Sequence, residues 1–135
     1  MVKIKYILLL LCLVILGCGK DNDDELPNVD SDIVGKWQLE ATRISPGGIV
    51  DWSNIANGEI YDFLDNGTFQ LSNSKECDMT SIGTYSLKED NLALEFLCDS
   101  ETRKPNYFFW FNEGKLVLGF IGCIEGCSYR FKKIN

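Results

Sequence analysis

The segment "IGTYSLKEDNLALEF", residues 82–96, decides the fold class. In its second half, large apolar side chains occupy every second position from Leu92 to Phe96. A period of two is typical of a half-buried antiparallel strand, whose successive side chains point to opposite faces. Glu89-Asp90 separates the two halves and suits a tight hairpin turn. The segment therefore predicts two antiparallel strands joined by a short turn.

The same alternation continues through most of the chain after residue 33, for example around Trp37 and Phe69. It predicts eight strands, at roughly residues 34–43, 59–64, 68–72, 82–88, 91–97, 106–112, 115–121 and 128–134. No window with a helical period competes, apart from a single turn near residues 52–57. The sequence predicts an all-β domain.

The connections between these strands fall into two kinds. The second, fourth and sixth are tight turns: Asp65-Asn66-Gly67, Glu89-Asp90 and Asn112-Glu113-Gly114. The first, third and fifth are long, at residues 44–58, 73–81 and 98–105, and the seventh holds two cysteines. In an up-and-down arrangement alternate connections lie at the same end. We therefore expect one closed end and one end that carries every long loop.

The chain before this domain begins with Lys3 and Lys5, followed by an apolar run of eleven residues from Tyr6 to Leu16. A helix needs ~20 apolar residues to cross a bilayer, so this run is too short to span one. A basic start, a short apolar middle and small residues at the end are typical of a secretory signal peptide. We assign residues 1–17 to such a signal and exclude them from the fold.

Ile15-Leu16-Gly17-Cys18 resembles the lipobox of bacterial lipoproteins, in which the chain is cut just before the cysteine. The resemblance implies that Cys18 carries the lipid and that more than one acyl chain holds the protein stably in a membrane. The expected location is outside the cytoplasm, as an outer-membrane lipoprotein. The alternative is an ordinary signal peptide with a leftover cysteine.

Residues 18–31 follow as a segment rich in acids, including Asp23, Asp24 and Glu25. Their composition predicts a solvated, flexible tether between the lipid and the domain at residues 32–135. A lysine followed by acids directly after the lipidated cysteine also resembles the tag that sends lipoproteins to the cell surface in one group of Gram-negative bacteria. That resemblance implies a surface-exposed protein.

Charge and residue types exclude several functions. Without residues 1–17 the chain has 11 basic and 20 acidic side chains, a net charge of −9, which disfavours nucleic acid as a partner. The chain has no histidine, and it contains no nucleophile motif, phosphate loop or cofactor motif. Acidic side chains in the loops, such as Asp78 and Asp99, read as a solvated rim rather than a metal site. We expect neither an enzyme nor a metal or cofactor.

Four cysteines remain in the domain, at positions 77, 98, 123 and 127. An even number in an exported chain predicts two disulfides, and the spacing does not suit a zinc site. The three residues between Cys123 and Cys127 form a short hairpin loop with a glycine, which brings these two cysteines opposite each other. This favours the pairs Cys123–Cys127 and Cys77–Cys98, which would pin the long loops.

Gly35-Lys36-Trp37 at the head of the first strand, together with the loop pattern and phrases such as "YDFLDNGTF", resembles small bacterial lipocalin-like lipoproteins. The resemblance implies an eight-stranded antiparallel up-and-down barrel over residues 33–134. It implies that Gly35 and Trp37 form the barrel floor, with an arginine of the last strand over the tryptophan. Arg130 is the arginine available, although its alternation with Phe131 directs it outward.

The resemblance also implies an interior pocket for a small apolar ligand, open at the loop end. The candidate ligand-binding residues are Trp52, Tyr61, Phe63, Phe96 and Phe120. An eight-stranded barrel is just wide enough to be filled by side chains or to hold one small ligand. The many bulky inward residues favour a filled or nearly filled barrel, in which these aromatics are core.

"NYFFWF", residues 106–111, carries aromatics on both faces of one strand. Either Phe108 and Trp110 or their neighbours must therefore lie outside the barrel. An exposed aromatic stripe often marks an interaction surface. The alternative function is a barrel that contacts a protein, including a protease, or a glycan through its loops and outer aromatics.

Overall fold

The computed structural model describes residues 32–135, so the expected signal peptide, the tether and Cys18 lie outside the described residues. The strands are β1 Gly35–Ile44, β2 Ser53–Asn54, β3 Ile60–Phe63, β4 Thr68–Ser72, β5 Ser81–Lys88, β6 Asn91–Cys98, β7 Glu101–Arg103, β8 Asn106–Asn112, β9 Lys115–Phe120 and β10 Cys127–Ile134. In this part of the chain there is no helix with the length and apolar character needed to cross a bilayer.

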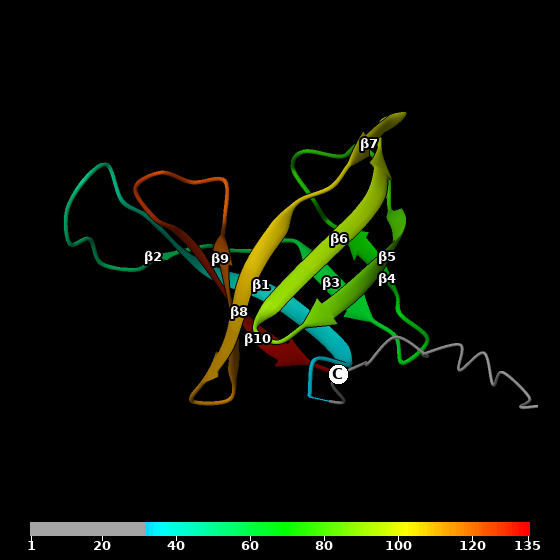
Figure 1. Ribbon diagram of the computed structural model, residues 1–135, viewed down its shortest axis with the longest axis horizontal. Coiled ribbons are helices and arrows are strands. Elements are labelled where there is room, and N and C mark those ends of the chain that lie inside the picture. Colours follow the sequence, from blue (N-terminus) through cyan, green and yellow to red (C-terminus); the bar gives the residue numbers. More distant parts are fainter. Residues whose placement is uncertain (1–31) are drawn as a thin grey trace, which may run out of the picture.

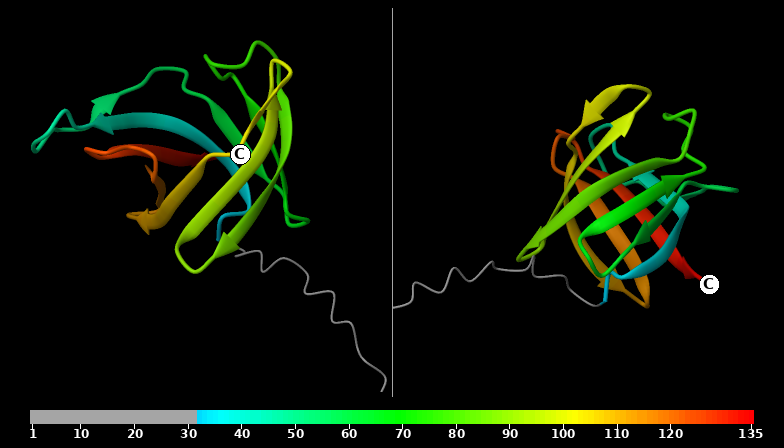
Figure 2. Two further views of the ribbon diagram at one scale, coloured as in Figure 1. Left: turned by 45° about the horizontal axis from the view of Figure 1, so that its top comes forward. Right: turned by 90° about the vertical axis from the view of Figure 1, so that its right-hand side faces the viewer.

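Eight of the strands form a closed antiparallel barrel (Figure 1, Figure 2). The order around the barrel is β1, β3, β4, β5, β6, β8, β9 and β10, and β10 pairs again with β1. The two remaining strands are additions at the loop end, where β2 pairs with β1 and β7 pairs with β6. The predicted all-β, eight-stranded up-and-down barrel is confirmed.

The two ends of the barrel differ as the loop lengths predict. The β3–β4, β5–β6 and β8–β9 turns lie together at the lower end in Figure 1, and the long connections lie at the upper end. In the β8–β9 turn, Glu113 and Gly114 have φ values of 51° and 73°. A type I′ turn requires positive φ at both central positions, and its twist matches the twist of the two strands that it joins. Local turn chemistry thus sets the closed end.

The two short strands lie where the sequence shows no alternation. Residues 52–57 form no helical turn, because Ser53–Asn54 pair with Thr42 and Ala41 of β1. β7 folds back along the end of β6 within the connection to β8. All side chains of β2 and β7 are exposed, so neither strand has a buried face that would produce a period of two.

Aromatic side chains fill the closed half of the barrel. The ring of Phe63 lies 5.0 Å from that of Tyr85 and 5.8 Å from that of Phe69, measured between ring centres. All three side chains are buried, and the Tyr85 hydroxyl donates a 2.6 Å hydrogen bond to the carbonyl of Leu64. Further buried members of this core are Leu92, Leu94, Phe109, Leu116 and Phe131. The closed half is therefore a packed core.

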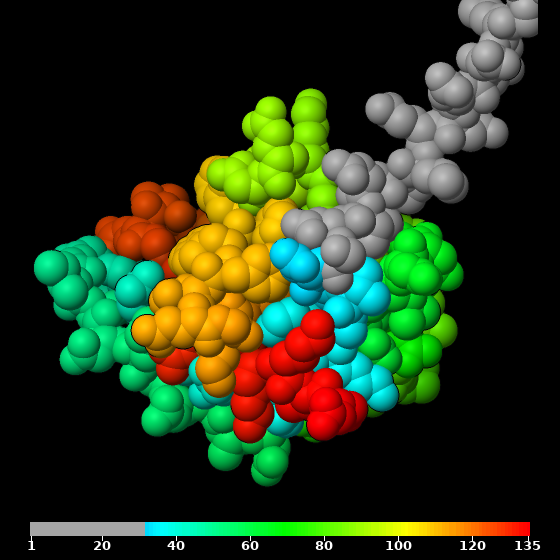
Figure 3. Space-filling view, turned by 90° about the horizontal axis from the view of Figure 1, so that it is seen from below, coloured from blue at the N-terminus to red at the C-terminus, as the bar shows by residue number. Residues whose placement is uncertain are grey.

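Trp37 seals the closed end. Its indole N–H donates a 2.7 Å hydrogen bond to the Ile33 carbonyl, and only 2% of the residue is exposed. Gly35 starts β1 with a φ of +125°, and a Cβ there would lie 3.0 Å from the Lys133 side chain. Seen from below, the start of β1, the end of β10 and the β8–β9 turn lie against one another (Figure 3).

The cation over Trp37 is a lysine. The Lys133 ammonium lies 5.2 Å from the centre of the Trp37 ring, a cation–π distance. Arg130, which the resemblance implied for this place, lies on the outer face, because the neighbouring Phe131 points into the core. The correction follows from the alternation along β10, since positions 131 and 133 face inward together.

Candidate functional site

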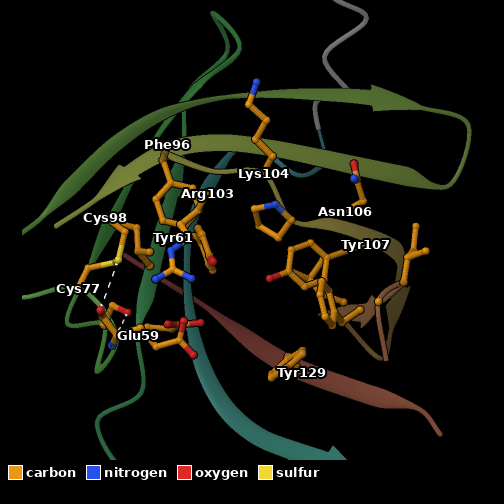
Figure 4. Close-up of a pocket in the computed structure, with 18 of the residues that line it drawn as sticks. Glu59, Tyr61, Cys77, Phe96, Cys98, Arg103, Lys104, Asn106, Tyr107 and Tyr129 are labelled. Atoms are coloured by element: carbon orange, nitrogen blue, oxygen red, sulfur yellow. Dashed lines mark hydrogen bonds between the residues drawn. A yellow bond between two sulfur atoms is a disulfide. The ribbon is translucent and has the colours of Figure 1, made fainter. Parts of the chain in front are cut away.

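The loop half of the barrel contains a cavity of about 630 Å³ (Figure 4). Its wall comprises Glu59, Tyr61, Leu71, Phe96, Tyr107, Leu118, Phe120, Tyr129 and Phe131, with Ser74, Glu76, Cys77, Cys98, Arg103, Lys104, Pro105, Asn106, Ile121 and Gly122 nearer the loops. Concave, mostly apolar sites of 300–1,000 Å³ are typical of small-molecule binding. The cavity is therefore the candidate functional site.

Close packing around Gly83 marks the lower limit of the cavity. Gly83 of β5 lies opposite Phe69 of β4, one level below the lining residue Leu71. A Cβ on Gly83 would lie 2.8 Å from the ring of Phe69 and 2.6 Å from the Cβ of Phe96, so no larger residue fits there. Phe96 packs against Phe69 with 5.7 Å between ring centres, which separates the filled half from the open half. The expectation of a filled barrel thus holds for the closed half alone.

A disulfide holds the mouth of the cavity. It joins Cys77 of the β4–β5 loop to Cys98 at the end of β6, and both are buried cavity-lining residues. The backbone N–H of Asp78 also donates a 3.0 Å hydrogen bond to the Asp99 carboxylate. The second disulfide, Cys123–Cys127, closes the β9–β10 loop. Both pairs are the ones expected from the hairpin argument.

Two carboxylates lie on one side of the cavity. Glu59 precedes β3, and Glu76 lies exposed in the β4–β5 loop. The Ser74 hydroxyl oxygen accepts the backbone N–H of Glu76 at 3.2 Å. Desolvation by burial raises the pKa of Glu59, the nearby Ser74 side chain lowers it, and the charge of Glu76 raises it further. The net shift is upward.

Three tyrosines bring hydroxyl groups into the cavity: Tyr61, Tyr107 and Tyr129. They come from three different strands, β3, β8 and β10. Desolvation is the largest cause of the raised pKa of all three phenols. The cavity thus offers neutral hydroxyls among apolar rings.

Of the five candidate ligand-binding residues, Tyr61, Phe96 and Phe120 line the cavity. In Figure 4, Phe96 and Tyr61 lie across the space from Tyr107. Phe63 does not line it, because it is fully buried one level below, between Tyr85 and Phe69.

Trp52 does not line the cavity either. Its ring lies between two guanidinium groups, with Arg43 and Arg130 each 4.7 Å from the ring centre. Arg130 also donates a 2.9 Å hydrogen bond to Glu40, which accepts a second bond from Lys115 at 3.0 Å. These residues form a polar cluster on the outer face, so the expected place of Trp52 at the mouth is corrected.

Sequence reasoning missed the polar part of the cavity. Glu59 stands at the first position of a predicted strand and Glu76 in a loop, and Tyr107 belongs to a strand whose inward face the sequence left open. β8 resolves that choice: Tyr107 and Phe109 point inward, while Phe108 and Trp110 are 47% and 41% exposed. These polar residues could have been found by asking which side chains face each inward tyrosine. That question needs the register between neighbouring strands, which the sequence does not give.

Comparison with known proteins agrees with this geometry. The family described as a lipocalin-like domain matches residues 33–118, which is more than half of the chain. The chain belongs to this family. No curated protein and no solved structure gives a significant match. The matched range covers β1 to β8 and the first four residues of β9 in the lipocalin-like barrel, and β10 lies beyond it.

Proposed function

We propose that this lipocalin-like barrel is a binding protein, not an enzyme, and that it takes up one small, mainly apolar molecule at its loop end. The observation that carries the proposal is the cavity of about 630 Å³, which has a packed core beneath it and loops around its mouth. Aromatic and leucine side chains supply apolar surface, worth roughly 25 cal/mol for each Å² of ligand surface buried.

The direct test uses a soluble form, in which residues 1–18 are exchanged for a cleavable secretory signal peptide. The core of the barrel lies within residues 32–135, so this form retains it. N-phenyl-1-naphthylamine, a neutral dye that fluoresces in apolar surroundings, is titrated into the protein. We expect a saturable rise in emission with one dye per chain. A linear, unsaturable response would contradict the proposal.

Cavity-filling variants supply the control. Leu118 and Leu71 lie on strands four places apart around the barrel, and both are buried lining residues. Leu118→Trp and Leu71→Trp should each abolish dye binding by occupying the cavity. Leu97→Trp is the matched control, because Leu97 is 60% exposed on the outer face and should leave dye binding unchanged. Circular dichroism checks that every variant folds.

The second part of the proposal is that Cys18 anchors the protein in the outer membrane, where the acidic tether carries it at the cell surface. The lipobox resemblance supports the anchor, and the apolar run is too short to span a bilayer. Metabolic labelling with a palmitate analogue should mark the wild type and leave Cys18→Ala unlabelled. Equal labelling of both would contradict the anchor.

This anchor would orient the cavity. β1 begins at Gly35 at the closed end, so a tether that enters there leaves the long loops facing away from the membrane. Fourteen flexible residues reach ~20 Å. Protease protection in intact cells tests the surface position, since a surface-exposed domain is degraded by added protease and a periplasmic one is not.

Contact with a protein or glycan is a second candidate, favoured by one observation. Phe108 and Trp110 stand next to each other on the outer face of β8 and are both more than 40% exposed. Exposed aromatic stripes are typical of interaction surfaces. A glycan array probed with the soluble form and with a Phe108→Ser/Trp110→Ser variant tests this function. Glycan binding by the wild type that the double variant loses would support an interaction surface on β8. Equal glycan binding by the two proteins would contradict it.

A further inference from the structure

The four charged residues that line the cavity divide into two kinds. The basic ones, Arg103 and Lys104, belong to the rim and have carboxylate partners outside the lining. Arg103 pairs with Glu101 at 3.1 Å, and Lys104 pairs with Glu95 at 3.0 Å. The Lys104 ammonium points away from the space in Figure 4. Their charges are therefore compensated on the outside of the cavity.

The acidic ones are not compensated in this way. Within residues 32–135, neither Glu59 nor Glu76 has a cationic group within ion-pair distance. Both residues line the cavity, and the negative charge of Glu76 is one of the causes that raise the pKa of Glu59, so the two carboxylates lie near each other, with Glu76 exposed at the mouth. The cavity thus has a negative side without a counter-charge.

Aromatic rings face this negative side. Tyr107 lies 5.6 Å from Phe120 and 6.4 Å from Tyr129 between ring centres, and the planes of Tyr107 and Tyr129 are perpendicular. They therefore form adjoining walls, with Tyr61 and Phe96 across the space (Figure 4). The faces of such rings carry partial negative charge and attract cations, most strongly where water is excluded.

The carboxylates and the rings share one electrostatic environment. After desolvation, the negative charges of Glu59 and Glu76 are among the causes that raise the pKa of Tyr61, Tyr107 and Tyr129. Each phenol therefore stays neutral and experiences the negative potential of the carboxylates. A positive group placed between the carboxylates and the rings of Tyr107 and Tyr129 would be stabilised from both sides.

We infer that the cavity selects an organic cation, an apolar chain that ends in a quaternary ammonium or protonated amine, with Glu59 and Glu76 as its counter-charge and the tyrosine rings as its cage. The inference rests on the proposed small-molecule site and names the chemical class of its ligand. An anionic amphiphile would face two carboxylates, and a neutral one would leave them without a partner.

Three probes with the same chain separate the possibilities: octyltrimethylammonium, 1-octanol and octyl sulfate. Isothermal titration calorimetry with the soluble form measures each dissociation constant at one ionic strength, below the micelle concentration. We expect octyltrimethylammonium to bind about tenfold or more tightly than 1-octanol, and octyl sulfate to bind least.

Charge-removing variants locate the effect. Glu59→Gln and Glu76→Gln should each weaken octyltrimethylammonium binding about tenfold and leave 1-octanol binding unchanged. Arg103→Gln should leave cation binding unchanged or strengthen it. Glu113→Gln, in the β8–β9 turn at the closed end, is the matched control and should change nothing.

The pH dependence adds an independent readout, because the quaternary ammonium keeps its charge at every pH. The groups that face Glu59 are Ser74, Glu76 and the cavity tyrosines, with Arg103 at the rim. Of these, Glu59 has a raised pKa and loses its negative charge on acidification. Octyltrimethylammonium binding should weaken as the pH falls through the raised pKa of Glu59, and this step should disappear in Glu59→Gln.

Each result decides between the two proposals. Equal affinity for octyltrimethylammonium and 1-octanol, with both lost in Leu118→Trp, would overturn the inference and keep the small-molecule site. Tighter binding of octyl sulfate that Arg103→Gln abolishes would also overturn it, in favour of an anionic ligand. Failure of all three probes to bind would overturn both.

Discussion

The hydroxyl of Tyr85 donates a 2.6 Å hydrogen bond to the backbone carbonyl of Leu64 in the closed half of the barrel. Tyr85 belongs to β5 and Leu64 follows β3, and β4 lies between these two strands in the sheet. The bond therefore connects two strands that are not neighbours. It lies beside the packed rings of Phe63 and Tyr85, in the core beneath the cavity.

Tyr85→Phe should destabilise the protein, because it removes this bond from a buried residue. A typical buried hydrogen bond contributes about 1 kcal/mol, and an unsatisfied partner adds to the loss. Urea unfolding should show a free energy of unfolding about 1–2 kcal/mol below the wild type. Tyr129→Phe is the matched control and should lose less, since the Tyr129 hydroxyl lines the cavity and has no such bond to the backbone within residues 32–135. Equal losses would contradict the account.

Loss of the Cys77–Cys98 disulfide should destabilise the protein more than loss of Cys123–Cys127. The first closes a sequence separation of 21 residues and the second a separation of 4, and longer closed loops restrict the unfolded chain more. Replacing Cys77 and Cys98 by alanine should cost about 3 kcal/mol in urea unfolding. A larger effect of the Cys123→Ala/Cys127→Ala variant would contradict this order.

Glu59→Gln should stabilise the unliganded protein at neutral pH while it weakens cation binding. Desolvation raises the pKa of Glu59 above its ordinary value of 4.5, so the folded chain holds this proton to a higher pH than the unfolded chain. Stability due to this group therefore falls as the pH rises from 4.5 through the raised pKa. Thermal unfolding across this range should show a flatter pH dependence for Glu59→Gln. An unchanged pH dependence would contradict a desolvated carboxyl.

Glu40→Gln should show the opposite pH behaviour. Desolvation alone would raise the pKa of Glu40, but hydrogen bonds from Lys115 and Arg130 outweigh it, so the net shift is downward from 4.5. The stabilisation is present above 4.5 and is lost as the pH falls through the lowered pKa. Between neutral and acidic pH, the wild type should therefore lose more of its free energy of unfolding than Glu40→Gln does. Urea unfolding at several pH values measures this loss for each protein. Identical losses in the two proteins would contradict this.

The parts of the fold that the sequence predicts are those with local causes. The β5–β6 hairpin follows from the alternation up to Phe96 and from the turn at Glu89, which adopts a φ of 56°. The barrel ends follow from loop lengths alone. Both depend on residues close together in the chain, so one sequence is enough to predict them.

The cavity could not be predicted in the same way, because it depends on which side chains meet across the barrel. Many bulky inward residues suggested a filled interior. They are instead concentrated in the closed half, and the cavity occupies the loop half above Phe69 and Phe96. That distribution is set by register, which alternation does not determine.

Trp52 shows the same limit. Its place in a long loop suggested a ligand-binding side chain, but the structure places its ring 4.7 Å from the Arg130 guanidinium on the outer face, although the two are far apart in the sequence. Arg130 itself faces outward, as its alternation with Phe131 predicts, and the cover of Trp37 was implied by the family resemblance alone. The register of β1 shifts between Leu39 and Ala41, beside Glu40, whose carboxylate accepts a hydrogen bond from Arg130 and completes the cluster.

The most direct test of the account is native mass spectrometry of the soluble form mixed with N-phenyl-1-naphthylamine, beside its Leu118→Trp variant. The account predicts one dye per wild-type chain, released on denaturation, and none on Leu118→Trp, whose indole occupies the cavity. A wild-type chain without dye, or equal numbers of dye molecules on both proteins, would contradict the claim that this cavity is the binding site.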